Sequence, residues 1–132
     1  MINYQDPDYV HWGNRNFYTR AISIIDEGVR EIYNAVLADE YYRDNTVFVI
    51  VPDCGRDNSR AAAVPFQHHF GSRCSHEVFA IVASPTPGKF NLRPNAKPVD
   101  RLQQQISVAA TVGELMGFRA EKADAESLLK VV

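Results

Sequence analysis

The sequence contains few cysteines, no long apolar run and no excess of basic residues. Two cysteines among 132 residues exclude a dense disulfide framework. No apolar run approaches the roughly 20 residues of a membrane-spanning helix. Fourteen Lys and Arg against 16 Asp and Glu give a net charge of -2, which argues against a protein that binds nucleic acid by neutralising its phosphates. No basic region followed by an apolar stretch opens the sequence, so no signal peptide is visible and a cytoplasmic location is the default expectation.

The composition is that of a soluble globular protein. Hydrophobic residues make up 45% and charged residues 23% of the chain, and both shares are ordinary for a folded domain. A chain of this length is enough for one domain and too short for two. We therefore expect residues 1–132 to form a single domain.

Residues 17–37 carry the clearest periodic pattern. Their apolar positions are separated by steps of four, three, four, three and four residues, a spacing that places them on one face of a helix. The pattern predicts an amphipathic helix that packs against a sheet. The positions are Tyr18, Ile22, Ile25, Val29, Ile32 and Val36.

Two short apolar runs, residues 46–51 and 78–83, predict strands. Both are continuously apolar, as in a parallel strand that is covered on both faces, so we expect central strands of an α/β sheet. The polar stretch between them, residues 56–77, holds three of the four histidines. A loop of this length is often functional.

The remaining sequence predicts helices and a connection. Residues 86–98 contain several prolines and predict a surface connection. A helix is expected over 99–116, ended by Gly117, and a short helix over 124–131. The plausible core positions of the longer one are Leu102, Ile106, Ala109, Ala110 and Leu115.

Three clusters contain the ligand types that zinc takes, namely carboxylate, imidazole and thiolate. Each cluster also has an ordinary structural interpretation, as a turn or cap residue after a strand, a partly buried polar residue, or a solvated loop. The two cysteines leave open one bridge, two thiols or a metal-bound thiolate. The clusters are Asp8 with His11, Asp53 with Cys54 and Arg56, and His68-His69 followed by Cys74 and His76.

In their order along the chain, these segments resemble sulfatase-like members of the alkaline phosphatase superfamily. Residues 8–13, Asp-Tyr-Val-His-Trp-Gly, are similar to the Asp-x-x-His-x-Gly segment of that family. Residues 45–56 look like its strand ending in Asp-His-Gly-Arg, and residues 66–85 look like its loop with a metal-binding His and the strand after it. Residues 106–118 look like its later Thr-containing helical segment. The resemblance covers roughly residues 4–130.

The resemblance implies a two-metal site for the hydrolysis of phosphate or sulfate esters. One metal would take Asp8, His11 and His69, and the other would take Asp53 and Cys54, with zinc as the favoured ion. The sequence departs from the family at Cys54, where the family has His, and at Ser107 and Ala110, where it favours Asp and Pro. The family's first Asp ligand and its nucleophile belong to an N-terminal half that has no counterpart before Asp8.

The implied fold is α/β, the C-terminal part of an alkaline-phosphatase-like sheet sandwiched by helices, with the N-terminal half absent. Such a sheet has an open edge, so we expect a partner chain or self-association to cover it. Two hypotheses follow. The chain is part of a split or truncated metal-dependent ester hydrolase without its own nucleophile, or it is a non-catalytic relic, without metal, that serves as a structural or interaction subunit.

Overall fold

A computed structural model describes residues 1–57, 64, 66–92 and 103–130. The chain divides into two compact units, the first of Met1–Asp39 with Ile50–Ile81 and the second of Glu40–Val49 with Val82–Val132. The chain changes unit between Asp39 and Glu40, and again within each of the two strands of the sheet. Each unit is described by itself.

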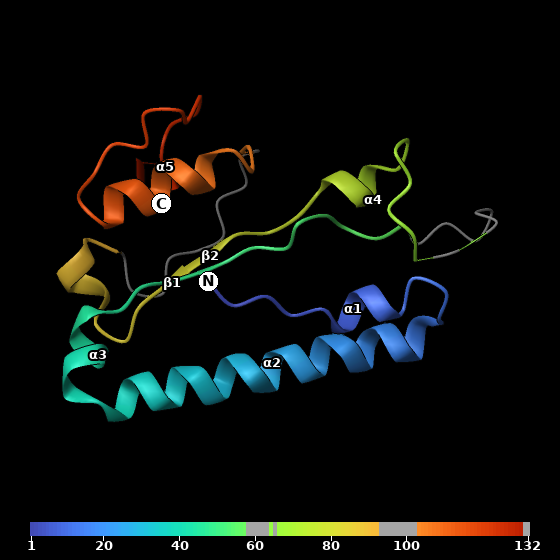
Figure 1. The fold of residues 1–132 in the computed structure, drawn as a ribbon, viewed down its shortest axis with the longest axis horizontal. Helices are drawn as coiled ribbons and strands as arrows, with labels where there is room; N and C mark the ends of the chain where they lie inside the picture. Colours follow the sequence, from blue (N-terminus) through green and yellow to red (C-terminus); the bar gives the residue numbers. More distant parts are fainter. Residues whose placement is uncertain (58–63, 65, 93–102, 131–132) are drawn as a thin grey trace. The chain divides into compact units, whose positions relative to one another are not determined.

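The first unit is built around the helix α2, Arg15–Ala38 (Figure 1). The predicted helix over 17–37 is thus confirmed. The helix begins after Asn14 because the side chain of that residue accepts hydrogen bonds from the amides of Asn16 and Phe17, at 3.0 and 3.2 Å, and so satisfies two donors of the first turn. It ends where Asp39 adopts an extended conformation.

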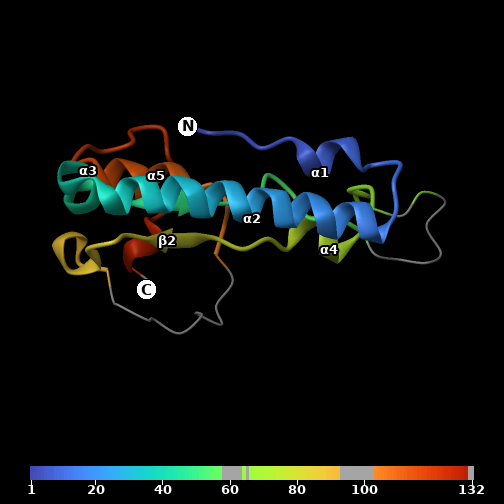
Figure 2. The same cartoon turned by 90° about the horizontal axis from the view of Figure 1, so that it is seen from below.

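The short helix α1, Asp6–Tyr9, lies beside the N-terminal part of α2 in both views (Figures 1 and 2). A glycine in the middle of α2 makes room for the segment that precedes α1. A Cβ added at Gly28 would lie 2.6 Å from the Tyr4 hydroxyl. Tyr4 therefore packs onto α2 at the one position where the helix has no side chain.

The sheet consists of β1, Phe48–Ile50, paired with β2, Ile81–Ala83. The two strands and the segments that continue them run in opposite directions (Figure 1). As the residue number rises along the first segment, the number of its partner falls along the second. Hydrogen bonds extend this hairpin on both sides of the strands: from Ser84 Oγ to the Thr46 carbonyl at 2.8 Å, from the Gly55 amide to the Ser75 carbonyl at 2.9 Å, and from the Asp57 amide to the Gln67 carbonyl at 2.7 Å.

The two strands are shorter and less buried than predicted. Residues 46, 47 and 51 lie outside β1, and residues 78–80 lie outside β2. β1 is half-buried along its length, and Phe79 and Ile81 are 58% and 46% exposed. A continuous apolar run predicts a strand whose two faces are both buried, whereas here the run belongs to an antiparallel hairpin whose side chains are only partly buried. The described residues form a two-stranded sheet, and the larger sheet sandwiched by helices stays a prediction.

Between the strands, the expected polar loop contains one helical turn, α4, Arg73–His76. It follows Ser72, whose backbone is extended, and is followed by Glu77, which is extended again. The turn places Cys74 and His76 close together in the chain on a short, exposed element, with only Ser75 buried.

The second unit contains α3, Glu40–Asn45, the 3-10 helices η1, Pro87–Phe90, and η2, Leu128–Lys130, and the helix α5, Ser107–Leu115. The predicted helix over 99–116 is therefore too long. Residues 103–106 are not helical, and residues 99–102, with the core candidate Leu102, lie outside the described residues. The predicted stop is confirmed, because Gly117 adopts a φ of 76°, a conformation that glycine accepts most readily.

The predicted core face of α5 is also wrong. Ile106 is 52% exposed, Ala109 is exposed, and Ala110 and Leu115 are half-buried. The fully buried residue is Thr111, whose hydroxyl donates to the Ser107 carbonyl at 2.7 Å and accepts from the Leu128 amide at 2.8 Å. This pair of bonds turns a polar side of the helix inward, toward η2.

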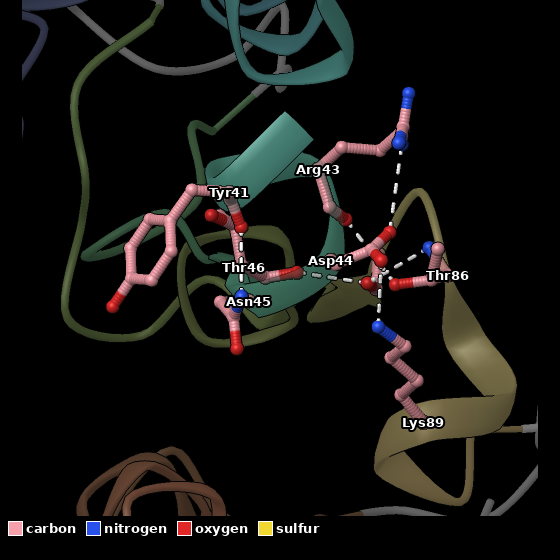
Figure 3. Close-up of polar contacts among 8 residues, drawn as sticks. Tyr41, Arg43, Asp44, Asn45, Thr46, Thr86 and Lys89 are labelled. Carbon is pink, nitrogen blue, oxygen red and sulfur yellow. Dashed lines mark hydrogen bonds and ion pairs between the residues drawn. The ribbon is translucent and has the colours of Figure 1, made fainter. Parts of the chain in front are cut away.

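A polar cluster joins the end of α3 to the segment after β2 (Figure 3). Asp44 accepts from Lys89 Nζ at 2.7 Å and from Arg43 Nε at 3.5 Å, and Thr86 Oγ1 donates to the Arg43 carbonyl at 3.2 Å. The hydrogen bond from Lys89 is the main cause that lowers the pKa of Asp44 below its usual value. The cluster fixes the start of the hairpin within this unit.

Few hydrophobic side chains are buried. Among the described residues, the buried ones are Ala21, Leu92 and Leu128, whereas Tyr9, Trp12 and Phe70 are each more than four-fifths exposed. Across the same residues, no helix combines the length and the apolar character that crossing a membrane requires.

Candidate functional site

The structure brings together the first two predicted ligands, Asp8 and His11. They lie three residues apart at α1, and His11 Nδ1 is 3.8 Å from Asp8 Oδ1. The Asp8 side chain is 65% exposed, whereas that of His11 is 21% exposed. A solvent-facing carboxylate therefore stands next to a mostly buried imidazole.

Arg56 holds this pair in place from the hairpin. Its side chain is 9% exposed, and its guanidinium donates to the Pro7 carbonyl at 2.9 Å, to the Phe66 carbonyl at 3.2 Å and to Asp8 Oδ1 at 3.3 Å. The planar guanidinium can serve three acceptors at once because it has five donors in a fixed arrangement. The predicted Asp-Cys-Gly-Arg segment thus contacts the predicted Asp-x-x-His segment through Arg56.

His11 is set up as a neutral imidazole. Burial is the main cause that lowers its pKa below the usual value of 6.5, and the positive charge of Arg56 lowers the pKa further against the opposing effect of Asp8. Its Nε2 atom is buried and has no hydrogen-bond partner in the described part of the chain. A neutral imidazole nitrogen without a partner is the form in which histidine binds a metal.

Asp53 and Cys54 follow β1, as expected, and interact with each other. Asp53 Oδ1 accepts from the Cys54 amide at 2.8 Å. Burial, and after it the Asp53 carboxylate, raise the pKa of the Cys54 thiol, while Arg56 opposes them more weakly.

Of the two adjacent loop histidines, the structure places His68 against His11. The ring centroids of these residues are 5.1 Å apart, edge to face. The predicted ligand His69 instead has its Nε2 3.1 Å from the Val64 carbonyl. The family resemblance implies His69, the second of the two histidines, as the metal ligand. The order of residues alone does not tell which of the two rings turns toward His11.

His76, which the sequence analysis also noted, has its Nε2 2.8 Å from the Phe70 carbonyl, and its ring packs edge to face on Phe70. Within residues 1–57, 64, 66–92 and 103–130, no three His, Cys, Asp or Glu side chains gather closely enough to hold a metal ion. The structure thus assembles a pair of predicted ligands, and the five-residue set stays a prediction.

The second unit has a cleft of about 580 Å³ beside α5. Small side chains and the exposed Phe118 form much of its wall, and Glu114, Arg119 and Glu126 supply the charges. None of the predicted ligands lines it. The candidate chemistry therefore belongs to the first unit.

Comparisons with protein-family models, with curated proteins and with solved structures give no match.

Proposed function

We propose that the chain is the C-terminal portion of a metal-dependent phosphate or sulfate ester hydrolase-like domain. In this proposal, Asp8, His11 and His69 serve one metal, and Asp53 and Cys54 serve the other. The observation that carries it is the buried Nε2 of His11, which lacks a partner among the described residues, while the exposed carboxylate of Asp8 lies 3.8 Å from Nδ1 of the same ring.

The chemistry of this pair supports a cation. Leaving a buried polar atom without a hydrogen bond costs about 1–3 kcal/mol. A cation bound to Nε2 of His11 would remove this cost. Carboxylate and neutral imidazole are both ligands that zinc accepts. When bound, a zinc ion would polarise an ester oxygen and lower the pKa of a nucleophile.

The residues of the first unit would hold and orient such a group. Arg56 donates one hydrogen bond to the carboxylate of Asp8 and another to the carbonyl of Pro7, the residue before it. Cys54, as a thiolate, would add negative charge that lowers the Lewis acidity of its metal. No family-like nucleophile follows from the sequence, so we expect no turnover by this chain alone, and the residues that complete the site would come from outside these 132.

A zinc titration with single variants tests the proposal. Isothermal titration of the full chain should show zinc binding, and Asp8→Asn and His11→Gln should each lose the zinc of the first site, because each removes one of its paired ligands. Asp6→Asn is the matched control, since it removes a carboxylate from the same helix without touching the pair. Equal zinc affinity in all four proteins, or no binding in any, would contradict the assignment.

The second candidate is a structural or interaction subunit, and the exposed apolar side chains favour it. Tyr9 is 82%, Trp12 81% and Phe70 95% exposed in the first unit, more large apolar surface than a self-sufficient fold needs to show. A two-stranded hairpin also has backbone groups that another strand can pair. Sedimentation should show a dimer or hetero-assembly at micromolar concentration, and a stable compact monomer that unfolds cooperatively would refute this candidate.

A further inference from the structure

The two cysteine segments are in direct backbone contact within the first unit. The amide of Gly55 donates to the Ser75 carbonyl at 2.9 Å, and a Cβ built on Gly55 would lie 1.9 Å from the carbonyl oxygen of Cys74. The residue after Cys54 therefore lies against Cys74 itself. Only a glycine permits this approach, since any side chain at residue 55 would collide with backbone.

This contact brings two thiols that are 20 residues apart in sequence near each other. One residue step of about 3.8 Å separates Cys54 from the contact, and a disulfide needs Cα atoms roughly 4.4–6.8 Å apart. Cys74 lies on α4, a helical turn of four residues. A disulfide between the two cysteines would need a displacement of this short element that brings the sulfur atoms into bonding range.

The two thiols differ in a way that suits sequential exchange. Cys74 is exposed and Cys54 is half-buried, and neither is in a disulfide. An external oxidant therefore reaches the exposed Cys74 more readily than the half-buried Cys54.

We propose that Cys54 and Cys74 form a reversible intramolecular disulfide that withdraws Cys54 from its metal. The oxidant is a small-molecule disulfide. The Cys74 thiolate attacks it, breaks its S–S bond and releases one thiolate. The Cys54 thiolate then attacks the Cys74 sulfur, forms the Cys54–Cys74 bond and releases the second thiolate. Two electrons pass to the oxidant, and the two protons of the cysteines go to the released thiolates. The withdrawal of metal rests on the proposed function, whereas the thiol pair does not.

Oxidised glutathione with mass spectrometry tests the thiol pair. The full chain should lose two hydrogens and its labelling by N-ethylmaleimide, and peptide mapping should link the two cysteines within one chain. Cys54→Ser should stop at a glutathione adduct on Cys74, because the resolving thiol is missing. Cys74→Ser should react more slowly, because only the half-buried Cys54 remains. The bridge should form more slowly in guanidinium chloride, where the contact is lost.

Two results would overturn the proposal: glutathione adducts on both cysteines without a link, or links only between separate chains. Repeating the oxidation with zinc present separates the two ideas. Slower bridge formation with zinc supports Cys54 as a ligand. An unchanged rate contradicts the withdrawal of metal and the ligand role of Cys54, and leaves the thiol pair intact.

Discussion

Replacing Arg56 by Met should destabilise the first unit strongly, because it removes one guanidinium that connects three separate segments. Arg56 joins the hairpin to the Pro7 carbonyl, to the Phe66 carbonyl and to Asp8. Methionine keeps much of the apolar stem, so the change isolates the hydrogen bonds from the packing of the side chain.

The magnitude follows from the burial of each partner. The ion pair with Asp8 contributes little, about 0–1 kcal/mol, because the carboxylate is 65% exposed. The bonds to the two carbonyls come from a charged donor whose side chain is 9% exposed, and such bonds contribute about 1.5–3 kcal/mol each before non-additivity. We expect Arg56→Met to lower the free energy of unfolding by about 2–4 kcal/mol.

Urea unfolding followed by circular dichroism measures this free energy, and hydrogen exchange locates the change. The amides near α1 and Phe66 should exchange faster in Arg56→Met. Arg30→Met is the matched control, since Arg30 pairs with Glu27 on the exposed surface of α2 and its loss should leave the unfolding midpoint unchanged. An Arg56→Met variant that unfolds at the same urea concentration as the parent would show that these hydrogen bonds do not stabilise the unit.

Four further substitutions have defined outcomes. Thr111→Val should cost about 1–3 kcal/mol of unfolding free energy, because it leaves a buried amide without its acceptor; thermal unfolding measures it. Gly55→Ala should cost about 1–3 kcal/mol because its Cβ meets a backbone carbonyl, whereas Gly28→Ala should be nearly neutral, since only a tyrosine side chain must move. Because Lys89 lowers the pKa of Asp44 below 3.8, the folded state gains from the ionised carboxylate above 3.8 and loses that gain as the pH falls through the lowered pKa. Asp44→Asn should remove this acid dependence, and a carboxyl titration by NMR with a midpoint of 3.8 or above would contradict it.

The sequence predicted best what depends on neighbouring residues. The helix over 17–37 follows from a local apolar period, and α2 extends it by two residues at the start and one at the end. Gly117 ends α5 for an equally local reason, its positive φ. The strands and α5 are shorter than predicted, since apolar composition marks a region but does not fix where hydrogen-bonded pairing begins.

The candidate site was only partly predictable because it depends on contacts between distant segments. Asp8 lies on α1 and His11 follows two residues after its end, so their proximity follows from their separation of three residues in the sequence. The contact of Arg56 with Asp8 joins residues 48 positions apart, and the packing of His68 on His11 depends on a rotation that no sequence pattern encodes. The raised pKa of Cys54 likewise depends on burial, which the sequence alone does not give.

Native mass spectrometry of the purified full chain tests the central claim most directly, because it reports bound metal and the number of chains in one spectrum. We expect zinc bound to the parent protein, about one or two ions per chain, and one zinc ion fewer in His11→Gln. A spectrum without metal at any zinc concentration that keeps the protein folded, in parent and variant alike, would contradict the metal site and leave the interaction subunit as the better account.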